Sequence, residues 1–136
     1  MKIFLDACAI IYWIESGEPY YSKLHNKLNQ IRKKHGPLPF AASALSLLEC
    51  RVKPFREKNA ELIGYYNHFF SAPNLTVTPL TSSVMEQATS LRAFHNLRTP
   101  DALQAASALA ASENKVIFVT GDTIFKKIHE LEVVLV

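Results

Sequence analysis

Four acidic residues stand out in the sequence because of the segments in which they lie. The chain has only three aspartates, and each stands where a predicted helix begins: Asp6, Asp101 and Asp122. Asp6 and Asp122 also follow short apolar segments that predict buried strands. An aspartate at a helix start often only caps the helix, so each one alone has an ordinary structural explanation. Their common placement indicates a shared site.

Glu49 is the fourth acid, and it lies where an apolar residue is expected. It shares one face of a predicted helix with three apolar residues that should face the core: Leu45, Leu48 and Val52. An unpaired ionised carboxylate in a core is too costly to keep, so Glu49 must be protonated, paired with a cation or bound to a metal ion. Arg51 and Lys53 project from other faces of this helix, so only a distant basic partner stays open.

Four carboxylates in one crevice would repel one another unless a cation joined them. The strand-to-helix turns of an open parallel sheet lie along its carboxyl edge, so Asp6 and Asp122 should face one crevice, which Asp101 could join. Oxygen ligands without Cys or His favour Mg²⁺ or Mn²⁺. Such an ion polarises a phosphate and activates bound water. The pattern indicates a phosphoryl-transfer type of site.

The elements that must position these acids alternate between strands and helices. Strands are predicted at 2–5, 38–42, 75–78, 116–119 and 133–136, and helices at 9–14, 24–31, 44–52, 57–70, 83–94, 99–112 and 124–131. This alternation calls for parallel strands joined by right-handed crossovers. We therefore expect an α/β fold, a three-layer sandwich with a central parallel sheet of about five strands flanked by helices. No repeat or linker divides the chain, so a single domain over 1–136 is expected.

Capping residues set the expected helix boundaries. Ser43 is a plausible N-cap for the helix that carries Glu49, and this helix should stop before Pro54. Ser83 and Glu86 have the form of a capping box. Thr99 should cap the alanine-rich helix that contains Asp101, with a proline in its first turn.

Composition excludes several classes of protein. The chain is 49% hydrophobic and 20% charged, as globular proteins are. No apolar stretch approaches ~18 residues, and Asp6 interrupts the first apolar run too early for a signal peptide. Cys8 and Cys50 form no CxxC pair or disulfide framework. We therefore expect a cytoplasmic protein that neither spans a membrane nor is secreted.

The remaining charge of the chain is basic. Fifteen Lys and Arg residues stand against twelve Asp and Glu, of which only eight remain once the four candidate acids are set aside. Arg51 and Lys53 follow Glu49, and Arg98 precedes Asp101. These three are expected to contact substrate phosphates, although exposed surface charge is the ordinary explanation for each.

Four segments resemble those of PIN-domain nucleases, in particular the VapC-type toxin ribonucleases of toxin–antitoxin pairs. They match in order and span nearly the whole chain: 3–12, 43–49, 97–106 and 118–125. The resemblance implies cleavage of RNA with Mg²⁺ or Mn²⁺, and a homodimer that a small antitoxin protein inhibits. It also implies a catalytic and metal-binding quartet, namely Asp6, Glu49, Asp101 and Asp122.

The chain departs from this family pattern directly after Asp6. Ala7 and Cys8 stand where the family commonly has a small hydroxyl residue and an asparagine. Outer hydrogen bonds orient metal ligands, so metal affinity or turnover would be reduced unless Thr120 supplies a compensating contact. Cys8 itself is expected to be a small buried residue rather than a thiolate ligand.

Two other functions stay open. The first is a non-catalytic PIN-like scaffold that binds RNA without cutting it, although such a scaffold would be expected to lose part of the quartet. The second is a small phosphatase of the haloacid-dehalogenase type, which the segment 119–123 superficially resembles. That chemistry needs a second acid two residues after the first aspartate, where this chain has Cys8.

Overall fold

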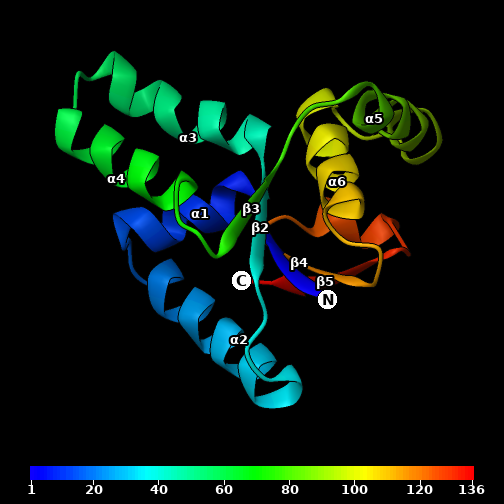
Figure 1. Cartoon of the computed structure of the whole chain (residues 1–136), viewed down its shortest axis with the longest axis horizontal. Helices are drawn as coiled ribbons and strands as arrows, with labels where there is room; N and C mark the ends of the chain where they lie inside the picture. Colours follow the sequence, from blue (N-terminus) through cyan, green and yellow to red (C-terminus); the bar gives the residue numbers. More distant parts are fainter.

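A parallel five-stranded sheet separates two layers of helices (Figure 1). The computed structural model describes all residues, 1–136. In chain order the elements are β1 (Lys2–Leu5), α1 (Ala7–Glu15), α2 (Tyr20–His35), β2 (Phe40–Ser43), α3 (Ala44–Arg56), α4 (Ala60–Phe70), β3 (Leu75–Thr78), α5 (Ser82–His95), α6 (Thr99–Ala111), β4 (Val116–Thr120), the 3₁₀ helix η1 (Thr123–Lys127) and β5 (Leu131–Leu135). This confirms the predicted α/β three-layer architecture.

The strand order β3-β2-β1-β4-β5 places the first strand of the chain in the middle of the sheet. Ile3 of β1 pairs with Phe40 of β2 on one side and with Ile117 of β4 on the other, and every pairing is parallel. From β1 the chain builds outward to β3 and then returns to the other side of β1. The order of the strands therefore reverses between β1 and β4, where open α/β sheets bind their ligands.

Each face of the sheet has its own apolar core. On one face, Ile3 and Leu5 of β1 pack with buried residues of α1, α2 and α4. On the other face, Phe4 stacks on Phe118 at 5.3 Å between ring centroids and packs against α5 and α6. Figure 1 shows these two helical layers on opposite sides of the sheet. The small side chains of α6 allow it to lie close against the strands, four of them fully or almost fully buried: Ala102, Ala105, Ala106 and Ala108.

Several predicted boundaries are wrong. Helix α3 continues through Pro54 to Arg56, because a proline near the helix end removes only one hydrogen bond and its ring is buried. The cap of α5 is Thr81, whose hydroxyl accepts from the Val84 amide at 3.2 Å, and not Ser83. Helix α6 begins at Thr99, so Arg98 takes the N-cap position.

The chain's last two elements also differ from the expectation. The segment predicted as a helix over 124–131 is the short 3₁₀ helix η1, and β5 starts at Leu131 instead of residue 133. The buried side chains of Phe125 and Ile128 hold this short connection against the sheet. A full helix does not form because the chain is needed for the edge strand directly afterwards.

The face of α3 that was expected to enter the core is largely exposed. Leu48 and Val52 are 59% and 45% exposed, whereas the buried side of the helix is formed by Ser46, Cys50 and Pro54. The exposed set and the buried set of residues both have helical spacing, and the set with the smaller side chains faces inward. Glu49 consequently lies at the border between the two and not within a core. No helix in the structure combines the length and the apolar character that crossing a lipid bilayer requires.

Candidate active site

Asp6 lies at the carboxyl end of the central strand, where β1 passes into α1. It is only 5% exposed. Its Oδ1 accepts from the Ala9 amide at 2.9 Å and caps α1, and its Oδ2 accepts a short hydrogen bond from the Thr120 hydroxyl. The pKa of Asp6 is raised to about 6: burial is the main cause, the negative charges of Glu49 and Asp122 add to it, and these two hydrogen bonds oppose it.

Thr120 joins the turn after β4 to the turn after β1. Besides donating to Asp6, its hydroxyl accepts from the Asp122 amide at 3.0 Å. Asp122 is exposed and caps η1 by accepting from the Ile124 amide at 2.9 Å. The fully buried Thr120 side chain thus sets the relative position of two of the candidate acids.

Glu49 is held by an amide and not by a basic side chain. Its Oε1 accepts from Nε2 of Gln104 at 2.9 Å, and the same nitrogen donates to the Ser46 hydroxyl at 2.8 Å. Gln104 lies on α6 and is 3% exposed. Glu49 therefore forms no ion pair, and no basic side chain competes with a ligand for its carboxylate.

Asp101 lies in the first turn of α6, and its side chain is 14% exposed. Its Oδ2 accepts from Nε of Arg98 at 3.2 Å, an ion pair whose arginine side chain is 80% exposed. The remaining oxygen has no partner within the protein.

All four acids line one cleft of about 420 Å³ at the carboxyl ends of β1 and β4. The other residues around it are Ala7, Cys8, Pro100, Gln104, Gly121, Thr123 and Phe125. The structure therefore brings together four carboxylates that are widely separated in the sequence. No Lys, Arg or His lines this cleft.

The sequence model of the PIN domain matches residues 3–131, nearly the full length of the chain. The chain belongs to the PIN domain family. No curated protein has a matching sequence.

Solved structures share the fold of this PIN domain over almost their whole length. VapBC2 from Rickettsia felis, bound to a DNA fragment from its promoter, has a TM-score of 0.73 at 21% identity and covers 99% of this chain and 98% of that one. A toxin–antitoxin complex from Klebsiella pneumoniae has a TM-score of 0.72 at 20% sequence identity, and the match covers 97% of this chain and 95% of that one. Mycobacterium tuberculosis VapC20, a toxin that cleaves the sarcin–ricin loop, has a TM-score of 0.70 at 16% sequence identity, and the match covers 96% of this chain and 97% of that one.

The cleft of this PIN domain fits a hard divalent cation by the chemistry of its donors. Its acids offer only oxygen atoms, and the repulsion that raises the pKa of Asp6 is the repulsion that a cation would relieve. No three His, Cys, Asp or Glu side chains are arranged to hold one ion directly. A magnesium site can nevertheless use one or two carboxylates and several waters, so the donor set is compatible with Mg²⁺.

None of the three basic residues expected to contact substrate lines the cleft. Arg51 is partly buried and donates to the carbonyl of Leu47 and the side chain of Asn67. Lys53 forms an exposed ion pair with Glu57 at 3.9 Å. Only Arg98 reaches the cleft, through Asp101.

Ala7 and Cys8, the residues that depart from the family pattern, border the cleft beside Gly121. A Cβ atom at Gly121 would lie 3.2 Å from Sγ of Cys8 and 3.1 Å from the Tyr12 hydroxyl, so the glycine allows these side chains to pack closely against the turn. Burial raises the pKa of the Cys8 thiol. The thiol therefore stays protonated near neutral pH, which disfavours a thiolate ligand.

Gln104 is the site residue that sequence reasoning missed. Besides its bonds to Glu49 and Ser46, it has a buried Oε1 without a partner. Reversing the amide would turn this oxygen toward the Glu49 carboxylate, so the observed orientation is the favourable one. In the sequence the only signal was a long polar residue three positions after Asp101, on the same face of an alanine-rich helix.

Proposed function

We propose that this PIN domain is a metal-dependent endoribonuclease that hydrolyses RNA phosphodiester bonds. The observation that carries the proposal is the convergence of Asp6, Glu49, Asp101 and Asp122 on one cleft at the point where the strand order reverses. Family membership supports the same activity. In this proposal all four acids are catalytic and bind Mg²⁺ or Mn²⁺, with Asp6 and Asp101 as the central ligands.

The protein's own side chains would prepare the site before a substrate binds. Thr120 and the Ala9 amide fix both oxygens of Asp6, and Gln104 fixes one oxygen of Glu49. Such outer hydrogen bonds hold ligands in one geometry. Glu49 and Asp122 would complete the site and position the attacking water. The bound ion would polarise the phosphate and make water nucleophilic.

Cleavage of a mixed RNA pool tests the proposal. We expect cleavage with Mg²⁺ or Mn²⁺, none after chelation, and a loss of at least about 100-fold in Asp6→Asn and Asp101→Asn. Glu130→Gln, which changes an exposed acid outside the cleft, is the matched control and should cleave like the wild type. Cleavage that is insensitive to chelator and to both aspartate variants would refute the assignment.

A second candidate is an RNA-binding PIN scaffold without catalysis. One observation favours it, namely that no three acidic side chains are arranged to hold one ion directly. Calorimetric titration with Mn²⁺ separates the two, because a nuclease site should take up the ion and lose that uptake in Asp101→Asn. RNA binding without Mn²⁺ uptake or cleavage would establish the scaffold instead.

We extend the proposal to a toxin that acts in the cytoplasm as a homodimer and is inhibited by a small antitoxin. Two of the structures with the same fold are toxin–antitoxin assemblies. An apolar surface on α3, formed by Leu48, Val52 and Phe55, is exposed and suits a protein partner. Expression in a bacterial host should arrest growth, Asp101→Asn should not, and sedimentation should show the dimer. Normal growth with wild-type protein at high level, or a monomer in sedimentation, would contradict this extension.

A further inference from the structure

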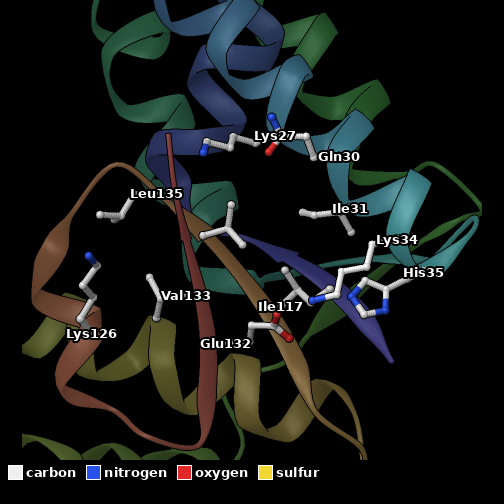
Figure 2. Close-up of a pocket in the computed structure, with 11 residues that line it drawn as sticks. Lys27, Gln30, Ile31, Lys34, His35, Ile117, Lys126, Glu132, Val133 and Leu135 are labelled. Atoms are coloured by element: carbon white, nitrogen blue, oxygen red, sulfur yellow. The ribbon is translucent and has the colours of Figure 1, made fainter.

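A second hollow of this PIN domain lies on the opposite side of η1 from the acidic cleft. It is a groove of about 370 Å³ between helix α2 and the edge strand β5, which we call the α2–β5 groove. Lys27, Lys34 and His35 of α2 line one side, and Lys126 of η1 lies on the other side of β5 (Figure 2). Glu132 is the only acid among the lining residues.

The charge of this groove is free to attract a ligand. The two ion pairs of the structure are Lys53 with Glu57 and Arg98 with Asp101, so none of the three groove lysines is paired with an acid. Ile31 and Ile117 also line the groove but are almost fully buried, so its accessible rim is mainly cationic. A cationic rim suits a ligand that carries repeated negative charge.

The spacing of two groove lysines allows contacts to separate phosphates of one strand. Lys27 and Lys34 are seven residues apart on one helix, hence on the same face and about 10.5 Å apart along the axis. This span is longer than the distance between neighbouring phosphates of one strand, so the two lysines can contact different phosphates.

The groove is adjacent to the acidic cleft. Phe125 lines the cleft, and Lys126, the next residue, lines the groove. Leu135 at the upper end of the groove pairs with Thr120, whose hydroxyl contacts Asp6. The cleft and the groove therefore share η1 and the carboxyl ends of β4 and β5 as neighbouring elements.

The cleft needs such a neighbour. It is lined by four acids and no base, Arg51 and Lys53 lie elsewhere, and only Arg98 at its edge contacts one of the acids. A polyanion brought to four carboxylates requires cationic contacts close by to offset the repulsion. We propose that the α2–β5 groove binds the backbone of the RNA substrate and leads it away from the cleft. This rests on the proposed ribonuclease function. Because lysine–phosphate contacts carry no sequence information, the groove adds affinity and not base specificity.

Binding of a fluorescein-labelled single-stranded RNA of about 20 nucleotides to chelator-treated protein tests the groove without cleavage. The triple variant Lys27→Ala, Lys34→Ala, Lys126→Ala should bind about tenfold or more weakly at low salt. The slope of log K against log salt should fall by about 2, since each lost phosphate contact on a single strand contributes about 0.7. RNA carrying 4-thiouridine should cross-link to peptides from α2 and β5.

A variant with the same change of charge outside the groove is the control. Lys23, Lys33 and Lys115 are exposed and do not line the groove, so their triple alanine variant should lose little affinity and keep the cross-links. An equal loss of RNA affinity in both triple variants would show an effect of net charge and would overturn the proposal that the groove binds RNA. The double variant Lys34→Glu, Lys126→Glu changes two exposed side chains and repeats the test if the triple variant does not fold.

The outcomes distinguish this inference from the proposed function. The wild type could show metal-dependent cleavage while the groove variants bind and cleave RNA as well as it does. That result would overturn only the role of the groove. Absence of cleavage and of RNA binding in wild type would overturn both. Tight binding of poly-glutamate in the groove, lost in the lysine variants, with weak binding of RNA, would assign the groove to an acidic protein segment and overturn its role in RNA binding.

Discussion

A buried carboxylate with carboxylate neighbours destabilises the folded state once it is ionised. The pKa of Asp6 is raised from 3.8 to about 6, first by burial and then by Glu49 and Asp122. That shift corresponds to a free-energy cost of about 3 kcal/mol for ionised Asp6 in the folded protein. The folded protein binds the Asp6 proton more tightly than the unfolded chain does, so this contribution lowers the free energy of unfolding as pH rises from about 4 to about 6. Above pH 6 the penalty is fully present.

Asp6→Asn should therefore stabilise the metal-free protein at about pH 8, by about 1–3 kcal/mol, and have little effect at about pH 4. Urea unfolding in the presence of chelator at both pH values measures the difference. Glu130→Gln, an exposed acid, should show no such pH-dependent gain. A gain for Asp6→Asn that is equal at both pH values would contradict the electrostatic explanation.

Gln104 links two helices through one amide. Replacing it with leucine keeps a side chain of similar volume but removes the donor to Glu49 and Ser46. We expect Gln104→Leu to weaken Mn²⁺ binding by about 10–100-fold while the protein stays folded. Calorimetry and the circular dichroism spectrum measure both properties. Gln87→Leu on the exposed face of α5 is the control, and unchanged Mn²⁺ affinity in folded Gln104→Leu would remove Gln104 from the site.

The sequence revealed the acids better than their partners. Asp6 and Asp122 follow strands, and parallel topology alone brings such turns to one edge. The environment of Glu49 was predicted wrongly, because α3 has two stripes of helical spacing and only packing decides which one is buried. The orientation of α3 about its own axis also places Arg51 and Lys53 away from the cleft. The only sign of Gln104 was its polarity on an alanine-rich helix, because its partner Glu49 lies 55 residues away in the sequence.

At the scale of elements, the cap of α5 shows how tertiary structure selects between neighbouring residues. Thr81 and Ser83 can both cap a helix, but the hydroxyl of Thr81 accepts from Val84 at 3.2 Å. Thr81→Ala should lower the free energy of unfolding by about 1 kcal/mol, and Ser83→Ala should change it little. Urea denaturation of the two variants provides the measurement. A larger loss of unfolding free energy in Ser83→Ala than in Thr81→Ala would identify Ser83 as the cap, as expected from the sequence.

Element types were predicted more accurately than their ends. The central strands β1 and β4 are covered on both faces and are apolar except for Lys2 and Thr120 at their ends, so sequence alone predicts them. The end of α3 beyond Pro54 and the short η1 depend on packing against other elements, which local propensity does not contain.

At the scale of the whole molecule, a bound cation would connect segments from both ends of the chain. A ligand that binds only the folded state stabilises it, by about 2.7 kcal/mol at a hundredfold excess over Kd. We expect Mn²⁺ to raise the melting temperature of wild type and not of Asp101→Asn, when sodium chloride at matched ionic strength is the reference. An equal increase in both proteins would place the ion outside the cleft.

The central position of β1 also has a consequence for how the protein is made. Residues 2–5 must wait for residues 116–119 before the middle of the sheet is complete. A nascent chain on the ribosome that has not reached residue 116 already contains Asp6, Glu49 and Asp101, but it can pair β1 only with β2 and it lacks Thr120 and Asp122. Under the proposed function, a chain released before β4 is made should therefore not cleave RNA, and the cell would meet this activity only when synthesis is nearly finished.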